Sequence, residues 1–211
     1  MQARAGADGA RAGFQSFSDL PIADVRGKAY TISMNTKTIF LFALVASLAG
    51  SGMAAGHKLC FAAVSADRVE APMVVVTNKV EGASGPYLEI PEGAGNPPKV
   101  NAGKAVYTVD IPADAEYILW ARVYWDDECG NSFTVVIDDQ PGFIFGEDAT
   151  YKKWHWVKYP VSRTAKPIAL TKGKHTITFH NREDGVALDQ ILLSADKRFV
   201  PVEIEKVGSF Q

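Results

Sequence analysis

The stretch 116-EYILWARVYW-125 decides the class of fold expected for this chain of 211 residues. From Tyr117 on, apolar residues recur at every second position, which is the period of a β-strand and not of a helix. The positions between them carry Trp120, Arg122 and Tyr124, so the second face of the strand is bulky as well. Such a strand predicts a sheet whose second face is either covered by another segment or used for contact.

Nine similar runs surround this one, separated by clusters of Gly, Pro, Asn and Asp. They cover residues 73–77, 86–90, 104–111, 132–138, 142–145, 153–159, 167–170, 174–179 and 187–194. Several of them alternate apolar with polar residues, as a half-buried sheet requires, and none has a long helical period. Ten short strands with these breakers predict an all-β fold, an antiparallel β-sandwich or barrel.

Residues 34–66 are expected to form a secretory signal peptide. Lys37 supplies a basic start, and the apolar run 39–49 is shorter than the ~20 residues that a membrane-spanning helix needs. Small residues follow this run. The pattern predicts export to the periplasm, the cell surface or the medium, without membrane insertion after cleavage; an uncleaved anchor or a buried helix is the alternative.

The cleavage site sets the domain boundaries. A cut after Ala66 is preferred, because it places the β-branched Val64 at the −3 position and the small Ala66 at the −1 position, as signal peptidases require. The competing cut follows Ala54 or Ala55, and only that cut would leave Cys60 in the mature chain to pair with Cys129. The expected parts are an over-extended, disordered start over 1–33, the signal peptide over 34–66 and one folded domain over 67–211.

The domain over 67–211 is acidic, with 16 Lys and Arg against 21 Asp and Glu, a net charge of −5. This balance disfavours nucleic acid as a partner, since nucleic acid binds a basic face. The sequence lacks a Gly-x-Ser-x-Gly elbow, a His-Glu-x-x-His motif and a phosphate loop. A non-catalytic monomer is therefore expected. A small exported hydrolase is an alternative that would need two carboxylates converging across a cleft.

A series of short motifs gives the chain a family resemblance. The motifs, in order, are 69-VEA-71, 84-SGPYLEIP-91, 109-VDIPADAEYILWAR-122, 131-NSFTVVID-138, the pair Trp154 and Trp156, 170-LTKGKH-175 and 188-LDQIL-192. Together they resemble the galactose-binding-domain-like sandwich of carbohydrate-binding modules of families 6 and 35. The resemblance spans nearly all of 67–211 and implies a jelly-roll antiparallel β-sandwich that binds a glycan or polysaccharide without catalysis. Because one fold hosts many functions, a module of the same fold that contacts protein or cell-surface material is the alternative.

The resemblance also implies a structural calcium ion. Such modules take ligands from an early Glu-x-Glu and a late Asp, which match Glu70 and Asp189 here. Pro72 stands where the second acid would be and removes one carboxylate from a site that normally has about six to eight oxygens. The calcium site is therefore expected at Glu70 and Asp189; alternatively, Glu70 is exposed and Asp189 caps a turn.

Sugar binding needs an aromatic face for the ring and planar polar groups for the hydroxyls, and loops between strands can offer both. Loop 125–132 offers Trp125 as a platform, with Asp126 and Asn131 as polar partners. Loop 180–185 offers Arg182 as a fork of donors. Its neighbours Asn181, Glu183 and Asp184 are the acceptors. Each loop has a plainer interpretation as a solvated, inert turn.

Two further sets of aromatic residues are candidates. Trp154 and Trp156 are two residues apart and share one face of a strand, where they form either a sugar platform or, as we prefer, part of the core. Trp156 is kept as a candidate ligand contact. Arg122 and its neighbours on the second face of 116–125 would line a concave cleft, unless a loop such as 92–103 covers them.

Overall fold

The computed structural model describes residues 21–23, 29–31, 56–77, 79–94, 103–161 and 166–210. The chain divides into two compact units, Met1–Gly52 and Met53–Gln211. In the first unit, β1 (Pro21–Ala23) and β2 (Ala29–Thr31) form an antiparallel pair. The apolar run of the predicted signal peptide, 39–49, lies outside the described residues.

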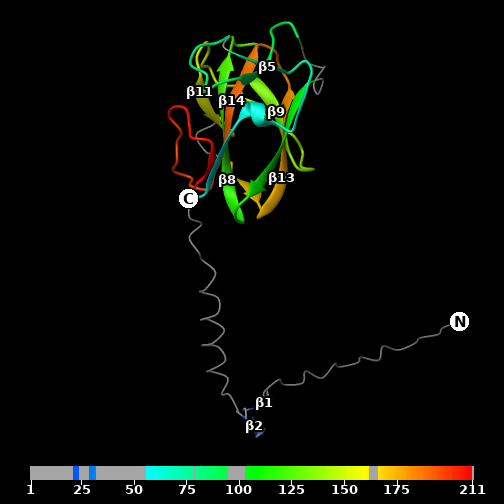
Figure 1. Ribbon diagram of the computed structural model, residues 1–211, viewed down its shortest axis with the longest axis vertical. Helices are drawn as coiled ribbons and strands as arrows, with labels where there is room; N and C mark the ends of the chain where they lie inside the picture. Colours follow the sequence, from blue (N-terminus) through cyan, green and yellow to red (C-terminus); the bar gives the residue numbers. More distant parts are fainter. Residues whose placement is uncertain are drawn as a thin grey trace, which may run out of the picture. The chain divides into compact units, whose positions relative to one another are not determined.

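The second unit is a β-sandwich of two antiparallel sheets (Figure 1). The five-stranded sheet has the order β10-β9-β13-β7-β4. Its strands are β4 (Arg68–Glu70), β7 (Lys104–Ile111), β9 (Ser132–Ile137), β10 (Phe143–Gly146) and β13 (Gly173–Asn181).

The eight-stranded sheet has the order β11-β8-β14-β3-β15, with β12 beside β8, β6 beside β14 and β5 beside β6. Its strands are β3 (Lys58–Ala62), β5 (Val74–Val76), β6 (Tyr87–Ile90), β8 (Ala115–Trp125), β11 (His155–Lys158), β12 (Ile168–Leu170), β14 (Val186–Ser194) and β15 (Gly208–Phe210).

The predicted all-β sandwich is confirmed, and each of the ten predicted runs contains a strand, with ends that differ by a few residues. The only helical element among the described residues is a single 3-10 turn, η1 (Ala63–Ser65). The alternation in 116–125 has the expected result: Tyr117, Leu119, Ala121 and Val123 are buried in the core between the sheets. Burying such a side chain stabilises the fold by about 1.5–3 kcal/mol, which is why strand period decides the architecture.

A β-bulge at Asp189 changes the phase of β14. Leu188 and Ile191 both belong to the core although they are three residues apart, an odd spacing that a regular strand cannot place on one face. The pairing of β14 with β8 shifts between Leu188 and Gln190, so Asp189 is the extra residue. The bulge therefore takes Asp189 out of the alternation while the strand keeps its apolar face on the core.

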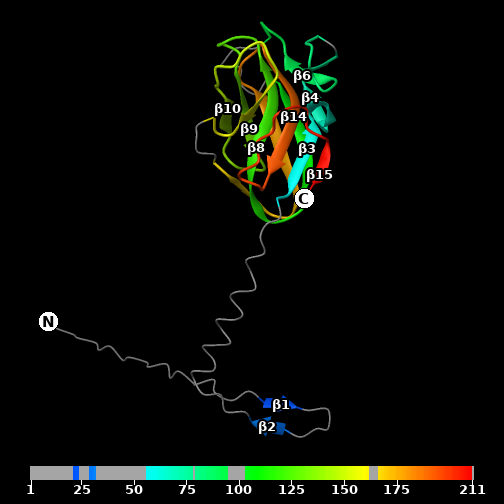
Figure 2. The same cartoon turned by 90° about the vertical axis from the view of Figure 1, so that its left-hand side faces the viewer.

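The domain boundary expected between Ala66 and Asp67 is wrong. β3 lies between β14 and β15 (Figure 2) and pairs with five residues of β14. Ala63 is fully buried, and its carbonyl oxygen accepts a hydrogen bond from Tyr107 Oη at 2.7 Å. The folded unit thus contains residues 58–66, so only a cut after Ala54 or Ala55 would leave the sandwich whole. Cys60 and Cys129 are both free, the first buried and the second exposed.

We expect a chain starting at residue 55 to fold and a chain starting at residue 67 to lose most of its stability. The shorter chain lacks an inner strand, a loss of about 5 kcal/mol or more, because large losses follow the removal of core contacts. That corresponds to a fall of roughly 10–20 °C in melting temperature. Circular dichroism melts of the two fragments measure it, and equal melting temperatures would contradict the role given to β3.

Candidate functional site

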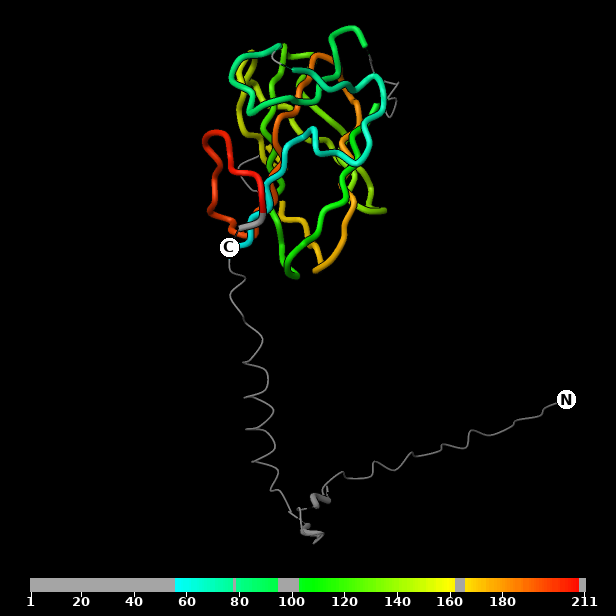
Figure 3. Tube along the Cα trace, in the orientation of Figure 1, coloured from blue at the N-terminus to red at the C-terminus, as the bar shows by residue number. Residues whose placement is uncertain are grey.

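The C-terminal segment, residues 195–207, covers part of the outer face of the eight-stranded sheet. Gln190 Nε2 donates to the carbonyl oxygen of Glu205 at 2.8 Å, and the amide of Glu205 donates back to Gln190 Oε1 at 2.9 Å. Trp156 Nε1 donates to the carbonyl oxygen of Glu203 at 2.7 Å. The segment, red in Figure 3, therefore covers part of a face for which the sequence left open a cleft or a covering loop.

The tryptophans of this face form satellite clusters and do not belong to the main core. Trp156 packs on a small cluster around Trp120. The Trp154 ring lies 5.1 Å from that of Tyr87 and 5.6 Å from that of Tyr124, centroid to centroid. Trp154 and Trp156 thus lie outside the main core between the sheets, although Trp156 packs on a smaller buried cluster.

Arg122 is held by protein groups and is not a fork for sugar hydroxyls. Arg122 is 9% exposed, and Asp189 is 0% exposed. Nη1 of Arg122 donates a hydrogen bond to Oδ2 of Asp189. Its Nη2 donates to the carbonyl oxygen of Gly82 at 3.0 Å, and its guanidinium carbon lies 5.5 Å from the ring centre of Trp154. Arg122 thus fastens β8 to the bulge of β14 and to the loop that contains Gly82.

The calcium site expected from Glu70 and Asp189 does not fit these side chains. Both oxygens of Asp189 accept hydrogen bonds from the protein: the amide of Ser84 lies 3.1 Å from each, Ser84 Oγ lies 2.6 Å from Oδ1, and Arg122 binds Oδ2. Glu70 belongs to the other sheet, where it forms ion pairs with Arg68 at 2.8 Å and Lys104 at 3.4 Å. A guanidinium, not a metal ion, balances the charge of Asp189. Among the described residues, no three His, Cys, Asp or Glu side chains are grouped so as to hold a metal ion.

Trp125 is a core residue, which contradicts its predicted role as the sugar platform. Its exposed fraction is 0%, and its ring lies 5.7 Å from that of Phe133 and 6.1 Å from that of His155. Its Nε1 donates to Asp148 Oδ1 at 2.7 Å, and His155 Nε2 lies 3.0 Å from Asp148 Oδ2. This buried network leaves no face of the indole for a ligand.

The loops 126–131 and 182–185 meet at one edge of the sandwich, as the two-loop site requires. A Cβ atom added to Gly130 would lie 2.2 Å from the carbonyl oxygen of Asp184, so the backbones are in close contact. The amide of Asn131 donates to Glu183 Oε2 at 3.0 Å. Only glycine permits this approach, and the contact fixes the two loops against each other.

Arg182, however, is bound by protein groups and is not free for a ligand. Arg182 binds Ser132 Oγ and Glu183 Oε1 through Nη1, and its Nη2 lies 3.2 Å from Glu147 Oε1. Asn181 and Asp184 are buried, at 2% and 7% exposed. Of the predicted acceptors only Glu183 binds Arg182, and the Oδ1 of Asn181 is buried without a hydrogen-bond partner. The predicted fork at Arg182 is therefore part of the structure of the loops.

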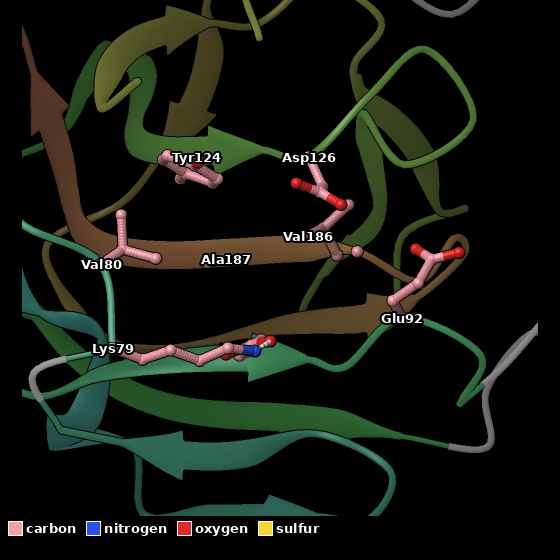
Figure 4. Close-up of a pocket in the computed structure, with 9 residues that line it drawn as sticks. Lys79, Val80, Glu92, Tyr124, Asp126, Val186 and Ala187 are labelled. Atoms are coloured by element: carbon pink, nitrogen blue, oxygen red, sulfur yellow. Dashed lines mark hydrogen bonds and ion pairs between the residues drawn. The ribbon is translucent and has the colours of Figure 1, made fainter. Parts of the chain in front are cut away.

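A pocket of about 280 Å³ lies on the outer face where β6, β8 and β14 meet. In Figure 4, Val186 and Ala187 of β14 run between two residues on one side, Tyr124 of β8 and Asp126 just after it, and Lys79 on the other side. Of the residues predicted to contact a ligand, Asp126 belongs to it, and so does Tyr124 from the cleft expected on the second face of 116–125. The lining residues are Lys79, Val80, Glu89, Glu92, Tyr124, Asp126, Gly185, Val186 and Ala187.

The pocket is acidic. Glu89 is 9% exposed; its Oε1 accepts a hydrogen bond from Lys79 Nζ at 2.5 Å, and its Oε2 is buried with no hydrogen-bond partner. The bond to Glu89 raises the pKa of the Lys79 ammonium. The charge of Asp184, followed by desolvation and by the charges of Asp127 and Asp126, raises the pKa of the Glu92 carboxyl group.

Gly185 keeps the acidic end of the pocket open. A Cβ atom there would lie 2.6 Å from Glu92 Oε2 and 3.4 Å from Asp126 Cβ, and the backbone φ of +66° is one that side-chain-bearing residues rarely adopt. Glu92 and Asp126 therefore both lie beside Gly185 at this end of the pocket. Sequence reasoning missed Glu92 and Glu89, although Glu89 was visible as a charge between the apolar Leu88 and Ile90 of a predicted strand.

Solved structures show what this fold is similar to. The chain matches a β-(1,4)-mannanase of Podospora anserina, named GH26-CBM35, with 17% identity and a TM-score of 0.52 over 68% of this chain and 29% of that one. An isomalto-dextranase of Arthrobacter globiformis matches with 18% identity and a TM-score of 0.49 over 64% and 23% of the two chains. A family 35 carbohydrate-binding module of Clostridium thermocellum matches with 15% identity and a TM-score of 0.46 over 64% and 96%.

The mannanase match shows the fold, a sandwich shared with a protein whose name includes a family 35 module, as the sequence motifs predicted. The chain spans less than a third of that enzyme, and the other two backbones are too distant to add to the comparison. No protein-family model matches the sequence, and no curated protein does. In the part of the chain that the structure describes, no helix is long and apolar enough to cross a membrane.

Replacing Trp125 by Ala is expected to lower the free energy of unfolding by about 3–5 kcal/mol, as for other large core aromatic residues. Trp125→Phe keeps the ring but removes the donor to Asp148, and we expect a loss of about 1–2 kcal/mol. Urea unfolding of both variants measures these losses. If the Trp125→Ala variant kept wild-type stability but no longer bound sugar, Trp125 would be the exposed sugar platform that the sequence predicted.

Arg122→Met is expected to destabilise the domain by about 3–5 kcal/mol, because it leaves Asp189 buried without its cation. Adding Asp189→Asn to the same chain should recover part of the loss. Excess chelator should leave the wild-type melting curve unchanged, since the oxygens of Asp189 already have partners. A melting temperature that falls with chelator would reinstate a structural metal ion.

Proposed function

We propose that this chain is an exported, non-catalytic carbohydrate-binding module whose ligand site is the pocket between β6, β8 and β14. The observation that carries the proposal is the aromatic ring of Tyr124 beside an open pocket whose other end holds the carboxylates of Asp126 and Glu92 (Figure 4). An aromatic surface with few planar polar groups is what a sugar ring needs. The likeness of the fold to part of a mannanase supports the same class of ligand.

The surroundings of Tyr124 favour a preformed site. Its ring contacts that of Trp154 at 5.6 Å and an interplanar angle of 57°, and Trp154 in turn contacts Tyr87, which is fully buried. A ring held in this way has little freedom to lose on binding, so more of the contact energy remains as affinity.

Binding is favoured over hydrolysis, although Glu92 and Asp126 do approach each other. A glycosidase needs two carboxyl groups that flank the bond, one of them free to donate a proton and the other to attack or activate water. Here both residues lie beside Gly185, at the same end of the pocket. Glu89 is neutralised by Lys79. Incubation with the bound glycan should therefore release no new reducing ends.

Export is part of the proposal, with cleavage after Ala54 or Ala55. The charge, apolar run and small residues of 34–56 support it. The inner position of β3 supports this earlier cut over the one after Ala66.

The same-fold alternative, a module that contacts protein, has support of its own in the C-terminal segment. Four apolar side chains there are exposed: Val200 at 61%, Val202 at 83%, Ile204 at 52% and Val207 at 54%. Such a stripe is typical of contact with another apolar surface. A screen in which the folded chain bound no glycan would favour this alternative.

Tyr124→Ala is expected to weaken binding to the best ligand of a glycan-array screen about ten- to thirtyfold, because it removes the aromatic anchor. Tyr124→Phe retains the ring and is the matched control, with affinity near that of the wild type. Isothermal titration gives the affinities, and thermal melts show that both variants are folded. Unchanged affinity in folded Tyr124→Ala would rule out this pocket as the sugar site.

A further inference from the structure

The charge of the pocket narrows the class of glycan that fits it. Three carboxylates, those of Glu89, Glu92 and Asp126, line it against one cation, Lys79. Asp184 acts on Glu92 with a further negative charge. Like charges repel across such short distances, so an acidic sugar is disfavoured there. A neutral sugar gains little from this excess of negative charge, whereas a cationic sugar gains directly.

Glu89 points to a missing donor. It is nine-tenths buried and lines the pocket, yet its Oε2 has no hydrogen-bond partner. A buried carboxylate oxygen without a donor is unfavourable, and a donor brought by a ligand would remove that penalty. This is a second observation, independent of the number of acids around it.

Lys79 holds Glu89 in a way that a ligand can replace. The side chain of Lys79 is 61% exposed while that of Glu89 is 11% exposed, so the ion pair lies at the surface on the lysine side. An alkylammonium group is a compact charge with three donors on a flexible stem. A protonated amine on a sugar offers the same charge and the same donors. Exchanging one for the other leaves the net charge around Glu89 unchanged, which keeps the cost of the exchange low.

Resting on the proposed function, we infer that the pocket selects glycans that carry a protonated primary amine, with units of the glucosamine type, and that the ligand amine displaces Lys79 from Glu89. Tyr124 contacts the sugar ring, and Asp126 and Glu92 accept from the amine or from neighbouring hydroxyls. Lys79 is then an internal placeholder for the ligand cation.

The test is titration of the folded chain, from residue 55 on, with β-1,4-linked hexamers of glucosamine, N-acetylglucosamine and glucose, and with an oligogalacturonide. At about pH 6 the sugar amine is protonated and carboxyl groups of ordinary pKa are ionised. We expect the glucosamine hexamer to bind about tenfold more tightly than its N-acetylated form, since one charge-assisted hydrogen bond has that effect. The preference should shrink as salt is added.

Three variants locate the effect. Glu89→Gln should abolish the preference for the amine, and Lys79→Met, which frees Glu89, should raise the affinity for the glucosamine hexamer severalfold. Asp126→Asn, at a partly exposed site, should weaken the preference and serves if Glu89→Gln fails to fold. Glu203→Gln is the matched control, because its side chain is exposed on the C-terminal segment and does not line the pocket. Thermal melts accompany each titration.

The outcomes separate the inference from the function on which it rests. If the neutral and the amine hexamers bound equally well, and Tyr124→Ala still abolished that binding, the inference would be overturned and the proposed function would stand. No binding of any hexamer or array glycan would overturn both. Tighter binding of the oligogalacturonide, lost in Lys79→Met, would show that Lys79 receives an acidic sugar and would also overturn the inference.

Discussion

The buried ion pair between Arg122 and Asp189 is the interaction on which the rest of the outer face depends. Asp189 occupies the bulge that lets β14 present Leu188 and Ile191 to the same core, and Arg122 reaches it from β8. Its other donor binds Gly82, and Ser84 binds Asp189 directly. Removing either charge would leave the other buried and unpaired, which is among the most destabilising changes a protein can undergo.

The same pair positions the pocket. The loop that it fastens, residues 79–85, begins with Lys79 and leads into β6, which carries Glu89. β6 in turn pairs with the first residues of β14, next to Ala187 in the pocket floor. The guanidinium of Arg122 in the interior thus holds in place the segments that form the acidic surface above it.

Strand period predicted the sandwich because burial on alternate positions is the largest favourable contribution to folding. Strand period did not predict β3, because the apolar residues of β3 that pair with β14 also resemble the end of a signal peptide. It missed β4 and β15, which have three residues each and show no alternation to read. For the site, period was a better guide than composition: it places Trp125 on the core face with Tyr117 and leaves Tyr124 on the outer face.

The loops could not be predicted in this way. A fork of donors flanked by acids looks the same in sequence whether it binds a ligand or its own neighbours. In this fold, the close approach of Gly130 to Asp184 brings acceptors to Arg182 from the other loop, so the network closes on itself. Which polar groups are left free is decided by backbone contacts between segments that lie about fifty residues apart, such as Asn131 and Glu183.

The pairing of β14 also bears on when the chain can fold during synthesis. Among the described strands, β3 has only β14 and β15 as partners, and β6 joins the sheet through β14. β14 begins more than a hundred residues after the end of β3 and close to a hundred after the end of β6, so these pairings form only once β14 has been made. Folds dominated by such distant pairings form slowly, because the entropy of long loops must be overcome first. Until β14 has been synthesised, β3 and β6 therefore lack the partner through which they join the sheet.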